Sequence, residues 1–358
     1  MNLLLLLFQV KNQLSIVQWT YSVSKKRIVV ICPGRGSYTR ETSNYLKEHG
    51  ASVSKSIQWM DDQRETQGLF SLTNLDRQNF KARTHMVGEN ASSLIYACSF
   101  SDFMSIDRTK YEIVSVLGNS MGWYTALVLS GAVSWENGFH LINTMGSMMK
   151  DELIGAQMIY PIVDDEWNVD QSMKDLVMSE LSNAGAYLSI NLGGFIVIGG
   201  DKSAIKKLSK ILPVKDKYPF IIPYHGAFHS PMLESISQSA RKLIDPSIFN
   251  KPSIPLIDGT GKVWSPYASD PNQIMEYTLG HQVQNTFDFT SSVTVALKEF
   301  CPDKVLLLGP GNSLGAPVGQ ILIENNWLSL KSKQEFSNHQ LADPFMISMG
   351  LRDQRNML

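Results

Sequence analysis

The chain has 358 residues, of which 43% are hydrophobic and 18% are charged, and its formal net charge is −1. This length is enough for one large domain or two smaller ones with a real core, and the near-neutral charge gives no reason to expect nucleic acid as a partner. The three cysteines form no Cys-x-x-Cys pair, which disfavours a disulfide framework or a cysteine-based zinc site and favours a reducing, cytoplasmic location.

The N-terminal segment 1–26 begins with the leucine-rich run "MNLLLLLFQV". The run is too short to span a bilayer, and it lacks the basic start and the small-residue cleavage site of a signal peptide. We interpret the segment as a leader that docks or frays as a helix, with a degenerate signal or a partner-binding segment as the alternatives. No other stretch approaches the length of a membrane span.

Residues 27–150 alternate between buried strands and helices. The β-branched run 28–31 stops at Pro-Gly and predicts a strand followed by a tight loop, and "TRETSNYLKEHG" predicts a helix closed by Gly50. Further helices are predicted at 92–104, 123–130 and 134–150, and a further strand at 113–117. This alternation indicates a parallel α/β sheet.

Residues 151–223 show a different order of predicted strands and helices. Their patterns predict a strand at 156–163, a helix at 169–185, a hairpin of strands at 186–192 and 194–200, a helix at 203–212 and a strand at 218–224. This β-α-β-β-α-β order is that of a ferredoxin-like unit, which needs no cofactor to fold. We therefore predict a small ferredoxin-like domain at 151–223. It is inserted into a large α/β-hydrolase-like domain formed by 27–150 and 224–330, and the patterns do not place the tail at 331–358.

Two Gly-x-Ser-x-Gly sequences follow apolar runs, "GNSMG" at 118–122 and "GNSLG" at 311–315. In such a sequence the serine can lie on a strained strand-to-helix turn, where backbone N–H groups form part of an oxyanion hole. An ordinary glycine-rich turn is the alternative for either copy. Ser120 precedes the strong helix-forming stretch "WYTALVLS", whereas Ser313 precedes "LGAPVG", a poorer helix start and a better loop. Ser120 is therefore the favoured nucleophile.

A serine hydroxyl becomes a nucleophile when a base takes its proton, and histidine is the usual base. Downstream of Ser313 the chain has a single histidine in the unplaced tail. Downstream of Ser120 it has five: His140, His225, His229, His281 and His339. The i,i+4 spacing of His225 and His229 suggests a metal pair, but a glycine between them and a proline after them disfavour a helix, and no third ligand is near. We expect no metal.

Four segments resemble those of a known family and occur in the same order. "ICPGRGS" resembles the family's "FPGQGS", "GNSMGWYTALVLSGAVS" its "GHSLGEYTALVAAGALS"-like segment, "GAFHSPM" its "HAFHSPLM" around the catalytic histidine, and "LLGPGNSL" its late "EVGPGKVL". The family is that of malonyl-CoA:acyl-carrier-protein transacylases and the acyltransferase domains of polyketide and fatty acid synthases. The resemblance covers residues 27–325 and leaves out the leader and the tail.

The resemblance implies an acyl-CoA:acyl-carrier-protein acyltransferase with a Ser–His dyad and a ping-pong mechanism. Ser120 would attack the thioester of an acyl-CoA with His229 as general base, and the phosphopantetheine thiol of an acyl carrier protein would then attack the acyl-serine ester. No cofactor would be bound, because coenzyme A enters with the substrate and phosphopantetheine with the acceptor. The expected partners are the carrier protein and the coenzyme A thioester, with no nucleic acid and no membrane span.

The resemblance also assigns supporting residues. The backbone N–H groups of Met121 and Arg35 would form the oxyanion hole. A backbone carbonyl in "NTFDF", at Asp288, would orient the histidine, with the Asp288 side chain as an alternative. An asparagine of the small domain, Asn191, would lie near the cleft.

The chain departs from the family pattern on the helix after Ser120. Malonyl-transferring members carry an arginine there that pairs with the malonyl carboxylate, whereas this chain has Met145. A buried carboxylate without that partner loses its charge pairing, and methionine offers an apolar wall instead. We therefore predict a neutral acyl group, acetyl or longer, in place of malonyl. Arg35, where the family has glutamine, is the alternative partner for a malonyl carboxylate.

Two other predicted pocket positions can be compared with the family pattern. Asn119 replaces the family's histidine before the serine, and Phe228 matches the bulky residue of members that take α-unbranched groups.

Two functions would use the same dyad. The first is acyl transfer in fatty acid or polyketide biosynthesis, and the alternative is a thioester hydrolase that removes acyl groups from stalled carrier proteins.

Overall fold

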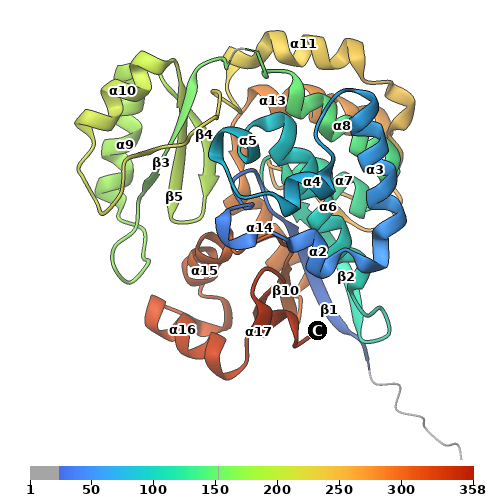
Figure 1. Cartoon of the computed structure of the whole chain (residues 1–358). Coiled ribbons are helices and arrows are strands. Elements are labelled where there is room, and N and C mark those ends of the chain that lie inside the picture. Colours follow the sequence, from blue (N-terminus) through green and yellow to red (C-terminus); the bar gives the residue numbers. More distant parts are fainter. Residues whose placement is uncertain (1–23, 152) are drawn as a thin grey trace, which may run out of the picture.

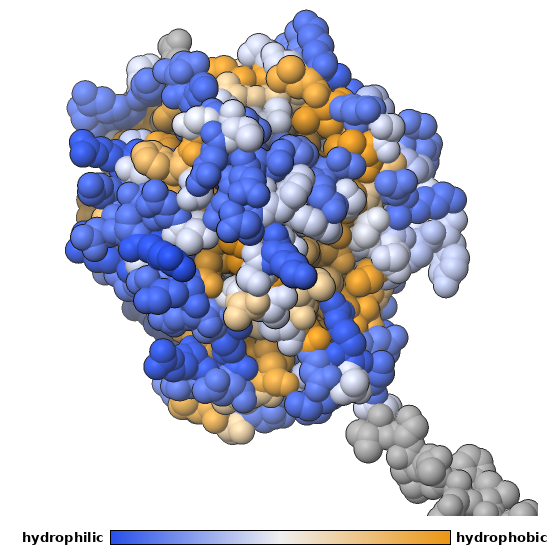
Figure 2. All heavy atoms as spheres, turned by 45° about the vertical axis from the view of Figure 1, so that its right-hand side comes forward, coloured by the Kyte–Doolittle hydropathy of each residue, from blue (hydrophilic) through white to orange (hydrophobic). Residues whose placement is uncertain are grey.

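The computed structural model describes residues 24–151 and 153–358, so the predicted leader lies outside the described residues except for its last three positions (Figure 1). Within these ranges, no helix combines the length and the apolar character needed to cross a membrane. On the face drawn in Figure 2, hydrophilic side chains dominate the surface and hydrophobic ones show in smaller areas between them.

The first sheet has six strands in the order β11-β10-β1-β2-β7-β8. Its strands are β1 (Lys26–Cys32), β2 (Tyr111–Gly118), β7 (Leu256–Ile257), β8 (Val263–Trp264), β10 (Lys304–Leu307) and β11 (Met346–Ser348). Neighbouring strands are parallel except in the β7–β8 pair. The successive residues Val29, Val30 and Ile31 are all buried, so both faces of the sheet are covered, which explains the unbroken apolar run in the sequence.

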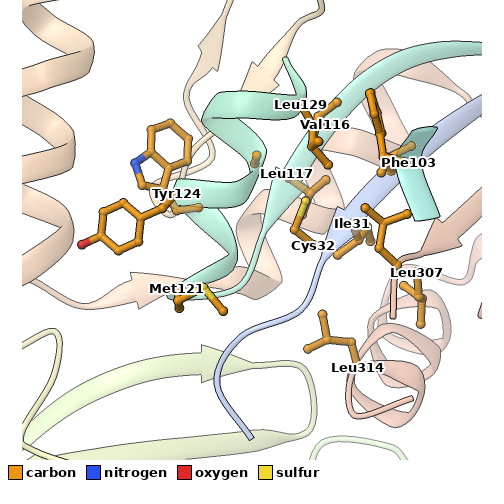
Figure 3. Close-up of a cluster of buried hydrophobic side chains, with 14 of the residues drawn as sticks. Ile31, Cys32, Phe103, Val116, Leu117, Met121, Tyr124, Leu129, Leu307 and Leu314 are labelled. Carbon is orange, nitrogen blue, oxygen red and sulfur yellow. The ribbon is translucent and has the colours of Figure 1, made fainter. Parts of the chain in front are cut away.

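Helices surround this sheet, and one of them is central. They are α2 (Tyr45–His49), α3 (Ser54–Thr66), α4 (Leu72–Arg77), α5 (Ala82–His85), α6 (Gly88–Ser105), α7 (Gly122–Leu129), α8 (Trp135–Ser147), α11 (Glu234–Leu243), α12 (Pro271–Glu276), α13 (Gln282–Gln284), α14 (Phe289–Phe300) and α15 (Gly315–Glu324). Every residue of α6 from Asn90 to Phe103 is buried. In Figure 3 the side chains of Cys32, Leu117 and Leu129 lie together in the core between β1, β2 and α7.

Short turns connect these elements. Single 3-10 turns are η2 (Arg40–Thr42), η3 (Ala51–Val53), η4 (Pro231–Leu233), η5 (Pro246–Ile248) and η7 (Trp327–Ser329), and η6 (Tyr277–His281) is a π-helical turn between α12 and α13. The predicted helix at 39–50 is interrupted because Asn44 adopts a left-handed φ of 70°, so that α2 begins only at Tyr45.

The second sheet has the order β6-β3-β5-β4-β9. Its elements along the chain are β3 (Ala156–Pro161), α9 (Gln171–Ala184), β4 (Tyr187–Leu192), β5 (Phe195–Gly200), α10 (Lys202–Ile211) and β6 (Phe220–Ile221). This confirms the predicted β-α-β-β-α-β order and the ferredoxin-like fold, whereas the boundaries at 151 and 223 stay predictions. The fifth strand, β9 (Phe287–Asp288), comes from outside the predicted insertion and pairs in parallel with β4.

The tail that the sequence patterns did not place belongs to the first sheet. It forms α16 (Lys333–Ala342), then β11 as the edge strand beside β10, then α17 (Arg352–Arg355). Arg355 forms an ion pair with Asp102 on α6, which is completely buried and also accepts a hydrogen bond from the Tyr45 hydroxyl at 2.7 Å. The tail is therefore fixed to the interior of the large domain.

Candidate active site

The turn from Gly118 to Gly122 joins the carboxyl end of β2 to the first residue of α7. Ser120 lies at its apex with a left-handed φ of 53°, a conformation that non-glycine residues rarely adopt. A side chain at Gly118 would collide with the Gly122 backbone, and one at Gly122 would collide with the Cys32 carbonyl on β1. The two glycines are therefore required by close backbone approach, and the turn has the predicted strained form.

A chain of three groups begins at the serine. The Ser120 hydroxyl lies 2.7 Å from Nε2 of His229, and Nδ1 of the same ring lies 2.6 Å from the backbone carbonyl of Gln282. His229 is buried and also has a left-handed φ, of 55°. The structure thus brings together the serine and the histidine that the sequence predicted as a dyad.

The carbonyl of Gln282 determines which histidine nitrogen carries the proton. A carbonyl oxygen only accepts, so Nδ1 must donate, and Nε2 then has a lone pair directed at the serine hydroxyl. Burial lowers the pKa of His229 to about 4, an effect that the Gln282 carbonyl partly opposes. The ring is therefore neutral at pH 7, which is the form that accepts a proton from Ser120.

Gln282 also holds the turn through its side chain. Its Nε2 donates to the Ser120 carbonyl at 3.2 Å, and its Oε1 accepts from the Tyr124 hydroxyl at 2.8 Å. One residue therefore orients the base and ties it to the serine and to α7. The sequence did not predict this role of Gln282, although the residue follows the π-helical turn η6, a feature that often marks functional sites.

The prediction that Asp288 orients the histidine is wrong, because Nδ1 of His229 contacts the Gln282 carbonyl instead. Its side chain caps α14 by accepting from the Ser291 N–H at 2.8 Å, and it accepts from the Asn191 amide at 3.1 Å. The prediction selected a position six residues too far along the chain, in β9 and not in α13.

The prediction that Asn191 lies at the cleft is also wrong, because neighbouring strand residues face opposite sides. Ile190 and Leu192 line the cavity, and Asn191 turns to Asp288.

The two predicted oxyanion donors lie at the cavity wall. Met121 is the residue before α7, and Arg35 is in the loop after β1. Within the described chain, neither backbone N–H has a protein acceptor. Both N–H groups are thus available to a ligand, and their role as an oxyanion hole stays a prediction.

A cavity of about 240 Å³ opens at Ser120 between the elements of the two sheets. Its lining includes the predicted pocket residues Asn119, Met145 and Phe228. Most of its wall is apolar: Met121, Ile142, Met145, Met149, Ile159, Ile190, Leu192, Val197, Ile222, Phe228, Leu233, Ile236, Val283 and Leu314. In Figure 3, Met121 lies where α7 begins and Leu314 lies on the segment that leads into α15.

The Arg35 side chain is held at the same wall. Its Nη2 donates to the carbonyls of Met86 at 3.0 Å and Tyr224 at 2.8 Å, and its guanidinium lies 5.2 Å from the centre of the Phe228 ring. Burial lowers the pKa of Arg35 to about 10, so the group stays charged at pH 7. Arg35 thus links the segments before α6 and after β6.

Ser313 also borders the cavity but lacks a base. Its side chain is exposed, and in the part of the chain that the structure describes its hydroxyl has no hydrogen-bond partner. The stretch after Ser313 forms the helix α15, so the expectation of a loop is wrong. The proline at 317 is tolerated because it falls in the first turn, where no intrahelical N–H bond is lost.

Among the described residues, no group of three or more His, Cys, Asp or Glu side chains could hold a metal ion.

Comparison with known proteins gives relatives that include proteins of polyketide biosynthesis. No protein-family model matches the chain. The polyketide biosynthesis malonyl CoA-acyl carrier protein transacylase PksC of Bacillus subtilis is 23% identical over 296 residues, which are 82% of this chain and 96% of PksC. The polyketide biosynthesis protein PksE of the same organism is 24% identical over 336 residues, which are 92% of this chain and only 40% of PksE.

The solved structures agree on the fold. The malonyl-CoA:ACP transacylase of Synechocystis sp. PCC 6803 matches with a TM-score of 0.71 and 16% identity, over 93% of this chain and 100% of that one. The transacylase FabD of Xanthomonas oryzae matches with a TM-score of 0.71 and 17% identity, over 93% of this chain and 98% of FabD. The fold is therefore that of the transacylases, a large α/β domain with a small ferredoxin-like domain. The two sequence relatives, both under 25% identical to this chain, carry names from polyketide biosynthesis.

Proposed function

We propose that the protein is an acyltransferase that passes an acyl group through Ser120 to an acyl carrier protein in fatty acid or polyketide biosynthesis. The observation that carries the proposal is the 2.7 Å contact between the Ser120 hydroxyl and His229 inside a mostly apolar cavity. The names of PksC and of the similar transacylase structures support the reaction class. A cytoplasmic location is part of the same proposal.

In the first half-reaction, Ser120 Oγ attacks the carbonyl carbon of an acyl-CoA while His229 Nε2 takes the hydroxyl proton. The C–S bond then breaks, and the imidazolium returns the proton to the leaving thiolate of coenzyme A. The Gln282 carbonyl stabilises the transient positive charge, because it accepts from Nδ1 throughout. The N–H groups of Met121 and Arg35 would hold the carbonyl oxygen as it becomes negative.

In the second half-reaction, the neutral His229 takes the proton of the phosphopantetheine thiol. The thiolate attacks the acyl-serine ester, and the proton passes to Ser120 Oγ as the ester bond breaks. No cofactor takes part, since coenzyme A and phosphopantetheine belong to substrate and acceptor. Water in place of the thiol would make the same site a carrier-protein thioester hydrolase, which is the alternative function.

The acyl group would be neutral. Met145 places a thioether, not a guanidinium, on the wall formed by α8, and the surrounding side chains are apolar. Arg35 is the remaining cation, but two backbone carbonyls occupy its Nη2. Beside Met145 a malonyl carboxylate would thus lose water without gaining a paired charge, and the Arg35 Nε, which has no hydrogen-bond partner among the described residues, is the alternative partner for that carboxylate.

The test follows the acyl group by mass spectrometry of the intact protein. We expect acetyl- or butyryl-CoA to acylate Ser120 faster than malonyl-CoA, and the acyl mass to move to a carrier protein that bears phosphopantetheine. Faster acylation by malonyl-CoA would contradict the neutral acyl group. Rapid release of free acid without a carrier protein would contradict the transferase and favour the hydrolase.

A further inference from the structure

A second histidine lines the cavity without a part in the dyad. His225 lies four residues before His229, in the segment that leads from β6 to η4, and its ring borders the cavity and packs edge-on against Phe228 at 5.7 Å. Its Nδ1 lies 2.9 Å from Oε1 of Gln157, a buried residue of β3. The mechanism proposed above does not use this pair.

Neighbouring groups fix the orientation of the Gln157 amide. The Ser189 hydroxyl donates to the Phe228 carbonyl at 2.8 Å, so its oxygen is free to accept from the Gln157 NH₂ group at 2.6 Å. The same NH₂ group also reaches the Phe228 carbonyl at 3.4 Å. The amide nitrogen therefore faces Ser189, and the amide oxygen faces the histidine.

This network determines the proton position on His225. An amide oxygen only accepts, so Nδ1 must carry the proton, and Nε2 has a lone pair. Within residues 24–151 and 153–358, Nε2 has no hydrogen-bond partner. Burial, together with the charge of the nearby Arg35, holds the pKa of His225 well below its usual value, so the ring is neutral at pH 7. The cavity thus contains a fixed hydrogen-bond acceptor in a mostly apolar wall.

The chemistry of this acceptor restricts its ligand. A carboxylate would be repelled by the Nε2 lone pair, and an ammonium group would be repelled by the neighbouring Arg35 cation. The described lining residues include no aspartate or glutamate that would hold such a cation. A hydroxyl is the smallest neutral group that donates a hydrogen bond, and its carbon chain would lie against the apolar side chains.

We propose that His225 Nε2 accepts a hydrogen bond from a hydroxyl group on the acyl chain, so that the cavity selects hydroxyacyl over unsubstituted acyl groups. This inference rests on the proposed function and names its substrate class. Gln157 also lines the cavity, and it is the positioning residue because its amide oxygen holds the histidine tautomer. A site that presents an acceptor to a substrate hydroxyl discriminates against the analogue without one, since the acceptor is then left unpaired.

The experiment compares 2-, 3- and 4-hydroxybutyryl-CoA with butyryl-CoA, using kcat/KM for acylation of Ser120 measured by intact mass. For the wild-type protein we expect at least one hydroxybutyryl ester to exceed butyryl by about tenfold, the scale of one hydrogen bond net of competition from water. His225→Phe keeps a ring of similar size without the lone pair and should reduce this ratio to about one. Gln157→Leu should reduce it part of the way, mainly through KM for the hydroxylated ester.

The matched control is His140→Phe on α8, whose ring packs on Trp59 and does not line the cavity, and its ratio should equal that of the wild type. A wild-type ratio near one for all three hydroxybutyryl esters would overturn the inference, as would a ratio that survives His225→Phe. In both cases acylation by butyryl-CoA would leave the proposed function standing. If no thioester acylates Ser120, the proposed function itself fails.

Discussion

The turns at 118–122 and 311–315 differ in sequence by a single residue, yet the structure uses them differently. In the first, Ser120 has a left-handed φ and lies 2.7 Å from a buried histidine. In the second, Ser313 is exposed, and the preceding Gly309 is fixed to α6, with its N–H donating to Asp102 at 2.7 Å and its carbonyl accepting from Ser99 at 2.6 Å. Two nearly identical sequences therefore differ in backbone conformation and in access to a base, and this difference favours Ser120 as the nucleophile of the proposed reaction.

The largest expected effect comes from removing the two serine hydroxyls in turn. Ser120→Ala should abolish acyl-enzyme formation, because no nucleophile remains, whereas Ser313→Ala should leave it unchanged. Intact-mass measurement after exposure to butyryl-CoA checks both variants. The opposite pattern would assign the chemistry to the second turn.

The base can be tested by mutation and by pH. His229→Ala should lower the acylation rate by about 10⁴-fold, at the upper end of general-base contributions. Because burial lowers the pKa of His229 to about 4, the wild-type rate should stay level as pH falls from 8 through 6.5 and drop only near pH 4. A rate that falls with a midpoint near 6.5 would show a solvated histidine.

The same pKa predicts the pH dependence of stability. The folded histidine binds its proton only near pH 4, whereas the unfolded one binds it near its ordinary value of 6.5. The unfolded state therefore binds more protons between these values, and the contribution of His229 to stability is present above 6.5 and lost as pH falls toward 4. Denaturant unfolding of wild type and His229→Phe across this range measures the difference.

The glycines provide a smaller contrast between the turns. Gly122→Ala places a methyl group against the Cys32 backbone carbonyl, which cannot move without distorting β1, and should lower the free energy of unfolding by about 3 kcal/mol or more. For Gly315→Ala the three atoms nearest the added methyl group all belong to the Asn312 side chain, which can rotate away, so the effect should be below about 1 kcal/mol. Urea unfolding followed by circular dichroism compares them, and equal losses would contradict the close-approach explanation.

The smallest effect concerns α8, the second helix after the first turn. Met145→Arg on α8 should raise the ratio of malonyl-CoA to butyryl-CoA acylation by about tenfold, because a guanidinium would pair with the carboxylate inside the cavity. Met148→Arg adds the same charge at the C-cap of α8, outside the cavity lining, and is the control. An unchanged ratio in the first variant would mean that Met145 does not set the charge of the acyl group.

The sequence allowed the elements next to the dyad to be predicted, because a buried parallel strand and a glycine-rich turn have strong local patterns. The residue that orients the histidine could not be found in this way. Gln282 acts through its backbone carbonyl, which every residue possesses, so nothing in its identity distinguished it from the carbonyl of Asp288. The strand β11 was missed for a related reason, since three residues in a polar tail give too short a pattern.

Strand β9 has a consequence for how the chain can be divided. Phe287 and Asp288 pair with Ile190 and Asn191, so the second sheet is completed by residues that lie more than sixty positions beyond the end of the predicted insertion. A fragment cut at 151 and 223 would expose the edge of β4, with unpaired N–H and C=O groups ready to pair with another chain. We therefore expect that residues 151–223 do not form a separable module.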